Sequence, residues 1–250
     1  MHRFHLPPAE CQADPLTLAG REAHHALHVL RVRTGEEVTI LDGAGQEFLC
    51  RVENFDRDKV HLAVLEKKSI PAPPCQITLL QAVPKGKIIE SIIQKATELG
   101  VARIVPLLTE RTVMELDEKD ARKKAEKWQQ IAMEAIKQCG AAWLPQVELP
   151  VRPEAFLARK ESFELPLIAS LHAGAEHPRN YFQKFELQHG RKPRSACIWI
   201  GPEGDFTPGE VSAIVSAGAL PITLGRLVLR VETAATYCLS ILNYEIQAPA

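Results

Sequence analysis

The chain has 250 residues and a mass of 27.7 kDa, enough for one large or two ordinary domains, so a disordered chain, a mini-protein and a fibre are excluded. Hydrophobic residues make up 46% and charged residues 24%, as in ordinary globular proteins. Because 30 Lys and Arg residues face 31 Asp and Glu residues, the formal net charge is -1 and bulk charge indicates neither a polyanion nor a membrane partner. Any nucleic-acid binding must therefore rely on local patches.

Apolar stretches and cysteines constrain the cellular location and the metal chemistry. The longest apolar stretches fall short of the roughly 20 residues of a membrane span. The N-terminus from Met1 to Pro8 lacks the apolar core of a signal peptide, so a cytoplasmic location is expected. The six cysteines are scattered, without a C-x-x-C pair or a histidine at zinc-ligand spacing. Neither a disulfide framework nor a metal site is expected.

The first seventy or so residues have the pattern of a small β domain. A helical spacing of apolar residues over 21–30 precedes the strands, and Asp42-Gly43 is a strong turn signal. Short antiparallel strands avoid exposed edges by curling up, so a barrel-like domain over residues 1–72 is predicted. Prolines at positions 71, 73 and 74 stiffen the chain and mark the domain boundary. The expected strands are residues 37–41, 47–52 and 59–65.

From residue 76 onward, strands alternate with helices. This alternation is typical of a parallel sheet covered on both faces, so residues 73–250 are predicted to form an α/β domain. On such sheets, ligands bind at the carboxyl ends of the strands. The expected strands are residues 77–83, 103–108, 167–171 and 197–200, and the expected helices are 88–99 and 117–139, the latter with Trp128, Ile131, Ala132, Ala135 and Cys139 facing inward.

A glycine loop from Ile200 to Glu210 follows a buried strand directly. Gly201 and Gly204 let the backbone turn sharply or approach a ligand closely. Residues 207–210 have the pattern of a capping box with Pro at the first helical position. Strand, loop and capped helix favour a cofactor site, and the alternative is a tight connection without a ligand. The loop is neither a Walker loop nor a G-x-G-x-x-G motif.

A second glycine loop follows an apolar strand that ends at Gly225. An irregular stretch with two arginines leads to Glu232 and Thr233, which open a helix. From residue 234 to 246 this helix is apolar on nearly every side, so more than one surface must bury it. Either a subunit interface or the interior of one monomer would do so. Residues 171–174 form a third candidate loop after a strand.

Several motifs stand in the same order as in a known family. They are Ile200-Gly-Pro-Glu-Gly, Leu224-Gly through Leu229-Arg230 to Glu232-Thr-Ala, His25 through Val29-Leu30-Arg31 to Gly35 with Asp42-Gly43, Gln81-Ala-Val-Pro-Lys-Gly-Lys, Gln94-Lys-Ala-Thr-Glu-Leu-Gly, Thr109-Glu-Arg, and Trp128 with Gln138-Cys-Gly. Over nearly the whole chain they closely resemble the RsmE family, the 16S ribosomal RNA uridine N3-methyltransferases of the SPOUT superfamily.

The resemblance implies the fold, the cofactor and the partners. Residues 1–72 would form a PUA-like RNA-binding β-barrel domain, and residues 73–250 a SPOUT methyltransferase domain with a deep C-terminal trefoil knot. It implies S-adenosylmethionine held in the knot, a homodimer with active sites near the interface, and a uridine of 16S ribosomal RNA in the small ribosomal subunit as substrate. Ordinary chain-topology rules would exclude a knot, so the knot follows from the resemblance alone.

The three loops are expected to converge on the cofactor. Backbone amides and carbonyls would bind adenine and ribose, and leucine side chains would supply apolar walls. S-adenosylmethionine has no phosphate, so no charged partner is required. The expected cofactor-binding residues are Leu171, His172, Ile200, Gly201, Pro202, Gly204, Leu224, Gly225, Leu227, Leu229, Thr233 and Ala234.

Methyl transfer to a uridine N3 requires removal of the imide proton, alignment with the methyl group, and stabilisation of charge on O2 or O4. Arginine stays protonated, so Arg230 is expected to bind the developing oxygen charge or a phosphate. Glu232 or Glu203 is expected to accept the proton. Alternatively, Glu232 caps its own helix and Glu203 holds its loop.

Some residues depart from the family pattern. Arg226 and Leu227 stand where the family usually has Pro-Arg, and Val231 replaces a Thr. Ala141 stands where an Arg usually follows Gln-Cys-Gly, so any RNA contact of that Arg must be made in another way.

Expected RNA contacts lie in both domains, because unpaired RNA is fixed largely through its phosphates. A solvated surface of mixed charge is the alternative, and spaced ion pairs are expected along the helix from residue 117. The expected RNA-binding residues are Arg3, Arg31 and Arg33 in the small domain and Lys85, Lys87, Lys95 and Arg111 near the active face.

Three other functions stay open. The chain could be a paralogue acting on another RNA or base, or an RNA-binding module without affinity for S-adenosylmethionine. An enzyme that holds a phosphate ligand at Gly201–Gly204 is the third, and the missing lysine argues against it.

Overall fold

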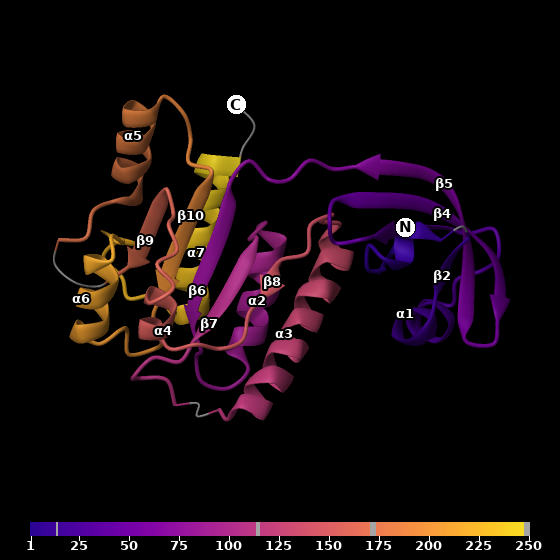
Figure 1. Cartoon of the computed structure of the whole chain (residues 1–250), viewed down its shortest axis with the longest axis horizontal. Helices are drawn as coiled ribbons and strands as arrows, with labels where there is room; N and C mark the ends of the chain where they lie inside the picture. The colour runs from indigo at the N-terminus through magenta and orange to yellow at the C-terminus, as the bar shows by residue number, and fades with distance from the viewer. Residues whose placement is uncertain (14, 114–115, 171–173, 248–250) are drawn as a thin grey trace. The chain divides into compact units, whose positions relative to one another are not determined.

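The structure is a computed structural model that describes residues 1–13, 15–113, 116–170 and 174–247, and the chain divides into two compact units. Unit 1 comprises Met1–Ala72 and Met133–Leu144, and unit 2 comprises Pro73–Ala132 and Pro145–Ala250. Figure 1 shows the long hairpin of β4 and β5 in unit 1 and the helix-covered sheet of unit 2. Among the described residues, no helix combines the length and the apolar character needed to cross a membrane.

Unit 1 is built on a five-stranded sheet with the order β1-β3-β4-β5-β2. β1 pairs with β3 in parallel, and the other neighbours are antiparallel. Register shifts in the β4–β5 pair bend the hairpin, as bulges do. The elements are β1 (His2–His5), a 3-10 helix (Glu10–Gln12), β2 (Leu16–Leu18), α1 (Gly20–His24), a π-helix (His25–Leu30), β3 (Glu37–Leu41), β4 (Gln46–Asp56) and β5 (Lys59–Ser69).

The three strands predicted in this region are confirmed as β3, β4 and β5, because their alternating side chains fill one core. Ile40 of β3, Cys50 of β4 and Leu62 of β5 are fully buried there. The helix predicted over 21–30 is confirmed in its first part, but from His25 it widens into a π-helix. Apolar spacing indicates a helical face without specifying the hydrogen-bonding step.

Residues 133–144 lie in unit 1, although the sequence placed them in the second domain. The guanidinium of Arg3 donates hydrogen bonds to the carbonyls of Lys137 and Gln138, at 3.4 and 3.0 Å. The backbone amide of Gly45 donates to the carbonyl of Ala142 at 3.0 Å. These contacts join segments more than ninety residues apart in the sequence. The helical pattern runs without a break to Gly140, so it does not reveal that the chain passes from unit 2 to unit 1 at residue 133.

Unit 2 is built on a six-stranded parallel sheet with the order β11-β9-β10-β6-β7-β8. The helices α2 and α7 pack against each other, and α7 also packs against β10 (Figure 1). The elements are β6 (Gln76–Ala82), α2 (Ile88–Glu98), β7 (Arg103–Leu107), α3 (Glu118–Cys139, which continues into unit 1), β8 (Gln146–Val147), α4 (Pro153–Leu157), β9 (Leu165–Ala169), α5 (Pro178–His189), β10 (Ser195–Ile200), α6 (Pro208–Ser216), β11 (Leu220–Ile222), α7 (Val231–Leu242) and a π-helix (Asn243–Gln247).

The predicted capping box at the start of α6 is confirmed. The Thr207 hydroxyl accepts a hydrogen bond from the backbone amide of Glu210 at 3.3 Å, and the Glu210 carboxylate accepts one from the amide of Thr207 at 2.8 Å. Pro208 occupies the first turn, where a missing N–H costs nothing. The glycine loop therefore has a rigid downstream anchor.

Most cysteines pack as small apolar side chains. Burial raises the pKa of the thiols of Cys50, Cys75 and Cys197 to about 12, so these thiols stay protonated. Cys139 differs from the prediction, because it is exposed instead of facing inward. It is the last residue of α3, where the chain leaves the packed face at Gly140 with a φ of 82°.

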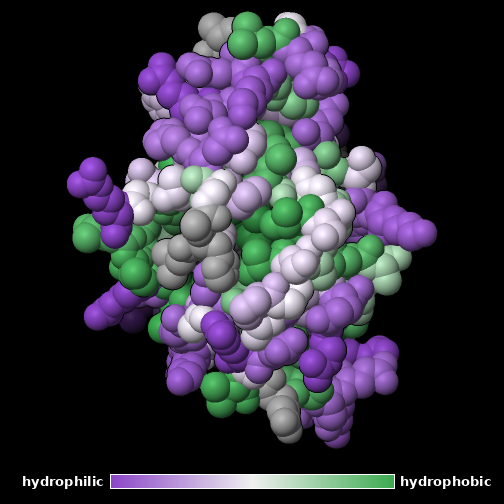
Figure 2. Space-filling model, turned by 90° about the vertical axis from the view of Figure 1, so that its left-hand side faces the viewer, coloured by the Kyte–Doolittle hydropathy of each residue, from purple (hydrophilic) through white to green (hydrophobic). Residues whose placement is uncertain are grey.

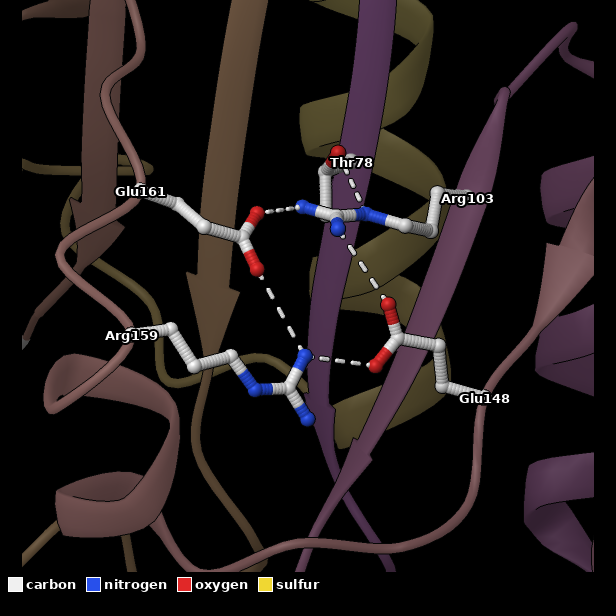
Figure 3. A network of polar contacts seen from close by, with 5 residues as sticks. All are labelled: Thr78, Arg103, Glu148, Arg159 and Glu161. Carbon is white, nitrogen blue, oxygen red and sulfur yellow. Dashed lines mark hydrogen bonds and ion pairs between the residues drawn. The ribbon is translucent and has the colours of Figure 1, made fainter.

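A ring of four charged side chains ties the connection after β8 to the sheet (Figure 3). Arg103 donates to Thr78 and Glu148 at 3.3 and 3.2 Å and also to Glu161. Arg159 donates to Glu148 at 2.7 Å and to Glu161 at 3.5 Å. Each charge thus lies between two opposite charges, and the hydrogen bond from Arg103 lowers the pKa of Glu161. The ring lies toward the amino ends of β6 and β7.

Candidate functional site

A cavity of about 470 Å³ lies in unit 2, where β9, β10 and β11 end. The carboxyl ends of parallel strands meet at one edge of a sheet, which is why segments far apart in the sequence share this cavity. Figure 2 shows apolar side chains gathered on the face of the molecule that lies at the left in Figure 1. The lining residues are Ile88, Ala169, Ser170, Ile200, Gly201, Pro202, Glu203, Asp205, Leu224, Gly225, Leu227, Val228, Leu229, Arg230, Val231, Glu232 and Ala234.

The first glycine loop, after β10, is packed tightly around Gly201. A Cβ atom on Gly201 would lie 2.8 Å from the Oδ1 atom of Asp205 and 3.0 Å from the backbone nitrogen of Phe206. Asp205 itself has a φ of 62° and accepts a hydrogen bond from the Phe206 amide at 2.8 Å. Phe206 is buried in the core. The loop therefore has one compact shape, which only a glycine at position 201 permits.

Three contacts hold this loop from the side of β6 and β7. The carboxylate of Glu203 accepts a hydrogen bond from the backbone amide of Lys85 at 2.9 Å. Arg111 donates to the backbone carbonyl of Gly204. The buried carboxylate of Glu210 accepts from the backbone amide of Glu110 at 2.9 Å. Segments after three strands are thus hydrogen-bonded together.

The second glycine loop, after β11, presents apolar side chains and backbone. Gly225 has a φ of 109°, a conformation that favours glycine, and its amide donates to the Thr223 hydroxyl at 3.2 Å. Leu227 and Val228 are 76% and 77% exposed. Large apolar side chains that are exposed side by side indicate a binding surface for a ligand or another protein.

Arg230 and Glu232 stand where this loop enters α7. Arg230 is the N-cap residue, and its carbonyl accepts from the amide of Ala234 at 2.8 Å. The guanidinium of Arg230 is exposed, and the carboxylate of Glu232 is half-buried. Neither side chain has a hydrogen-bonding or ion-pair partner within the described part of the chain. Both charged groups are therefore available to a ligand in the cavity that they line.

The cavity gathers most of the residues predicted for the site. Gly204 and Thr233 do not line it, and Leu171 and His172 lie outside the described residues. The predicted residues that line it are Ile200, Gly201, Pro202, Glu203, Leu224, Gly225, Leu227, Leu229, Arg230, Glu232 and Ala234. The lining residues that were not predicted from the sequence are Ile88, Ala169, Ser170, Asp205, Val228 and Val231.

The missed residues differ in how they could have been found. Ala169 and Ser170 immediately precede the predicted loop at 171–174, so a wider loop would have included them. Ile88 lines the cavity because it begins the helix after β6, which lies next to β10. That neighbourhood is a property of the sheet order, which no local pattern reveals.

The residues predicted to bind RNA lie in several places. In unit 1, Arg31 and Arg33 are exposed, whereas the guanidinium of Arg3 is bonded to two backbone carbonyls. In unit 2, Lys85, Lys87 and Arg111 are exposed near the first glycine loop. Lys95 lies in the last turn of α2, where its ammonium donates to the Ser91 hydroxyl at 3.1 Å. That turn is about 10 Å from Ile88 at the cavity, given the rise of a helix.

Comparison with known proteins identifies the family. A family model described as an RNA methyltransferase domain matches residues 71–243, and one described as an RNA methyltransferase PUA domain matches residues 18–65. The chain is 31% identical to ribosomal RNA small subunit methyltransferase E of Bacillus subtilis, over 94% of this chain and 92% of that protein. The chain belongs to the ribosomal RNA small subunit methyltransferase E family. The predicted fold class, a PUA-type domain followed by a methyltransferase domain with a parallel sheet, is confirmed.

Two solved structures of methyltransferases agree with this family. A Legionella pneumophila protein, solved with the bound cofactor S-adenosylmethionine, is 33% identical with a TM-score of 0.85, over 97% of this chain and 96% of that chain. Ribosomal RNA small subunit methyltransferase E of Neisseria gonorrhoeae, bound to S-adenosylmethionine, is 28% identical with a TM-score of 0.84, over 98% and 97% of the two chains.

Proposed function

We propose that the cavity binds S-adenosylmethionine and that the chain transfers its methyl group to N3 of one uridine in the 16S RNA of the small ribosomal subunit. The observation that carries this proposal is the convergence of two glycine loops on one cavity with apolar walls, in a chain of the methyltransferase E family. We expect the reaction to take place in the cytoplasm, where ribosomal subunits assemble.

The cavity residues fit this cofactor. The volume of the cavity, about 470 Å³, falls in the range of small-molecule binding sites. Leu224 and Leu229 are partly exposed apolar walls for an adenine ring, and the loop backbone offers amides and carbonyls to its polar edge. No lysine lines the cavity among the described residues, in contrast to a phosphate-binding loop. When bound, the cofactor supplies an electrophilic methyl group on a sulfonium.

Arg230 is the proposed stabiliser of negative charge. Removing the imide proton of uridine places negative charge on O2 and O4, and a fixed cation next to these oxygens lowers the energy of the transition state. The guanidinium of Arg230 is permanently charged and lines the cavity without a partner in the described part of the chain.

Glu232 is the proposed proton acceptor. Its carboxylate lines the cavity two residues after Arg230 and has no hydrogen bond to a described group. The carboxylate of Glu203 already accepts a hydrogen bond from the amide of Lys85. A free carboxylate is better placed to take a proton from a bound base, so the structure favours Glu232 over Glu203 for this role.

The Gly225→Ala variant is expected to weaken binding of S-adenosylhomocysteine at least tenfold. A Cβ at φ 109° forces the backbone of the second loop to move, and this loop lines the cavity. Gly218→Ala is a matched control. Gly218 has a φ of 103°, a Cβ there would meet no atom within 4 Å, as at Gly225, and Gly218 does not line the cavity. Calorimetric titration that finds equal affinities for the two variants would contradict the assignment of the cavity.

We also propose a homodimer and a knotted C-terminal region. Exposed apolar groups on the second loop, α7 and the π-helix after it support the dimer: Leu227, Val228, Tyr237 and Tyr244. The other face of α7 is buried against α2 and β10. A second surface is needed to cover the exposed apolar face, as the apolar sequence of this helix indicates. The fold shared with the two solved methyltransferase structures supports the knot. A sedimentation equilibrium that yields only monomer would reject the dimer.

The two predicted domains have separate proposed tasks. We propose that the PUA-type domain over residues 1–72 contacts RNA through Arg31 and Arg33, which are exposed, and through Arg3. The methyltransferase domain over residues 73–250 contributes Lys85, Lys87, Lys95 and Arg111. Phosphate contacts of this kind fix the substrate, while the cavity selects the base.

Labelled methyl transfer tests the proposed function. The chain is incubated with radiolabelled S-adenosylmethionine and small ribosomal subunits from cells that lack the modification. Label is expected to enter the 16S RNA of these subunits, and subunits that already carry the modification are the control. An absence of transfer to the unmodified subunits, with cofactor binding intact, would reject the proposed substrate in favour of another RNA or base.

A further inference from the structure

The first glycine loop lies between the cavity and two cationic segments of unit 2. One side of the loop, with Gly201 and Pro202, lines the cavity. The other side is bonded to the segments that follow β6 and β7, the next strands along the sheet after β10. A change in the position of this loop is therefore transmitted to both segments.

The segment after β6 touches the cavity at one end and the loop at the other. The backbone amide of Lys85 donates to the carboxylate of Glu203 at 2.9 Å. Gly86 follows with a φ of 69°, and Lys87 is the N-cap residue of α2. Ile88, the next residue, lines the cavity. The exposed side chains of Lys85 and Lys87 are thus carried by a turn whose two ends both meet the cofactor site.

The segment after β7 is held by two further contacts. Arg111 donates to the carbonyl of Gly204, and a Cβ on Gly204 would lie 3.3 Å from the Cδ atom of Arg111. The buried carboxylate of Glu210 bonds the amides of Glu110 and Thr207, at 2.9 and 2.8 Å. This segment is fixed more firmly than the first, because two separate side chains join it to the loop and to α6.

We propose that Glu203 is a positioning residue that couples occupation of the cavity to the geometry of the Lys85–Lys87 turn, so that bound cofactor raises the affinity for RNA. The proposal rests on the proposed function. A cofactor that binds this shape of the glycine loop stabilises it together with the turn bonded to it, and RNA then binds lysines whose backbone is already in place. Linkage requires the reverse as well: bound RNA raises the affinity for the cofactor by the same factor.

The role differs from that of a proton acceptor in what the carboxylate must provide. Holding the amide of Lys85 requires only a hydrogen-bond acceptor, which the side-chain carbonyl of a glutamine also provides. Accepting a proton from uridine requires the carboxylate itself. The variants Glu203→Ala and Glu203→Gln therefore separate the two roles.

The test measures the affinity for a 16S RNA fragment with and without saturating S-adenosylhomocysteine. For the unaltered chain, S-adenosylhomocysteine, the form of the cofactor left after methyl transfer, is expected to strengthen RNA binding at least fivefold. This factor is within the usual range of coupling between sites. In Glu203→Ala the ratio of the two affinities is expected to fall below twofold, and in Glu203→Gln to recover at least half of the original ratio. A merely structural defect would weaken both affinities and leave their ratio unchanged.

Glu110→Ala is the matched control. It removes the same charge from an exposed residue of the neighbouring segment, and the Glu110 carboxylate has no partner in the described part of the chain. Its affinity ratio is expected to equal that of the unaltered chain. A Glu203→Ala ratio equal to that of the control overturns the proposal, and so does an unaltered chain without coupling. Failure of the unaltered chain to bind S-adenosylhomocysteine at all, measured separately by calorimetry, instead rejects the proposed function on which the coupling rests.

Discussion

Replacing Lys137 with methionine is expected to lower the free energy of unfolding by about 3–5 kcal/mol, the usual cost of removing one partner from a buried ion pair. The ammonium of Lys137 lies 2.8 Å from a carboxylate oxygen of Glu22 and 2.9 Å from one of Glu134. Lys137 and Glu22 are only 6% and 9% exposed. The substitution leaves the Glu22 carboxylate buried without its cation, while its other oxygen still accepts from the amide of His5 at 3.1 Å.

Urea denaturation followed by circular dichroism measures this loss, and hydrogen exchange at the amides of β1 and β3 locates it in unit 1. Lys123→Met is the matched control on the same helix, because its ammonium and the Asp120 carboxylate lie 3.9 Å apart and both are mostly exposed. That control is expected to lose less than about 1 kcal/mol. The double variant Glu22→Gln, Lys137→Met is expected to regain part of the loss, since no buried charge is left unpaired. A loss below about 1 kcal/mol for Lys137→Met would show that the pair contributes little.

The Arg230→Ala variant is expected to lower kcat by about 10²- to 10³-fold, the usual effect of removing one group that stabilises an oxyanion. Its affinity for S-adenosylhomocysteine is expected to stay within about threefold of the unaltered chain, because the walls around the cofactor keep their leucines and glycines. The reason for the large effect on kcat is that negative charge appears on the uridine oxygens only during the reaction.

Steady-state methyl transfer at saturating substrate measures kcat, and calorimetric titration measures the affinity. Arg226→Ala is the matched control: Arg226 is an exposed arginine of the same loop that does not line the cavity. Its kcat is expected to stay within about threefold of the original value. Unchanged turnover in Arg230→Ala would remove this residue from the site. An equal loss of cofactor affinity would assign Arg230 to cofactor binding.

The sequence predicted those parts of the fold that short-range chemistry determines. Apolar residues between turn signals predicted β3 and β4, a continuous apolar run predicted β10, and the spacing of Thr207 and Glu210 predicted the cap of α6. These features depend on neighbours within a few residues. The short strand β2 and the helix α5 were missed, because three residues carry too little alternation and the polar composition of α5 hides its buried face.

Features that depend on long-range packing could not be predicted in this way. The periodicity of α3 shows which face is apolar, but not that residues 133–144 leave unit 2 and bind Arg3 and Gly45 in the N-terminal part of unit 1. The entry of Ile88 into the cavity depends on β6 lying beside β10. The hydrogen bond between Glu203 and Lys85 joins residues 118 positions apart. Such pairs become neighbours only through the order of the strands.

We propose that the two glycine loops and Arg230 position a methyl group for transfer to N3 of a uridine in 16S ribosomal RNA. Mass spectrometry of the nucleosides of small subunits, after treatment with the chain and S-adenosylmethionine, tests this proposal. We expect 3-methyluridine to accumulate to about one per subunit and Arg230→Ala to produce it far more slowly. A methylated nucleoside other than 3-methyluridine, or no new methylated nucleoside from subunits that lack the modification, would contradict it.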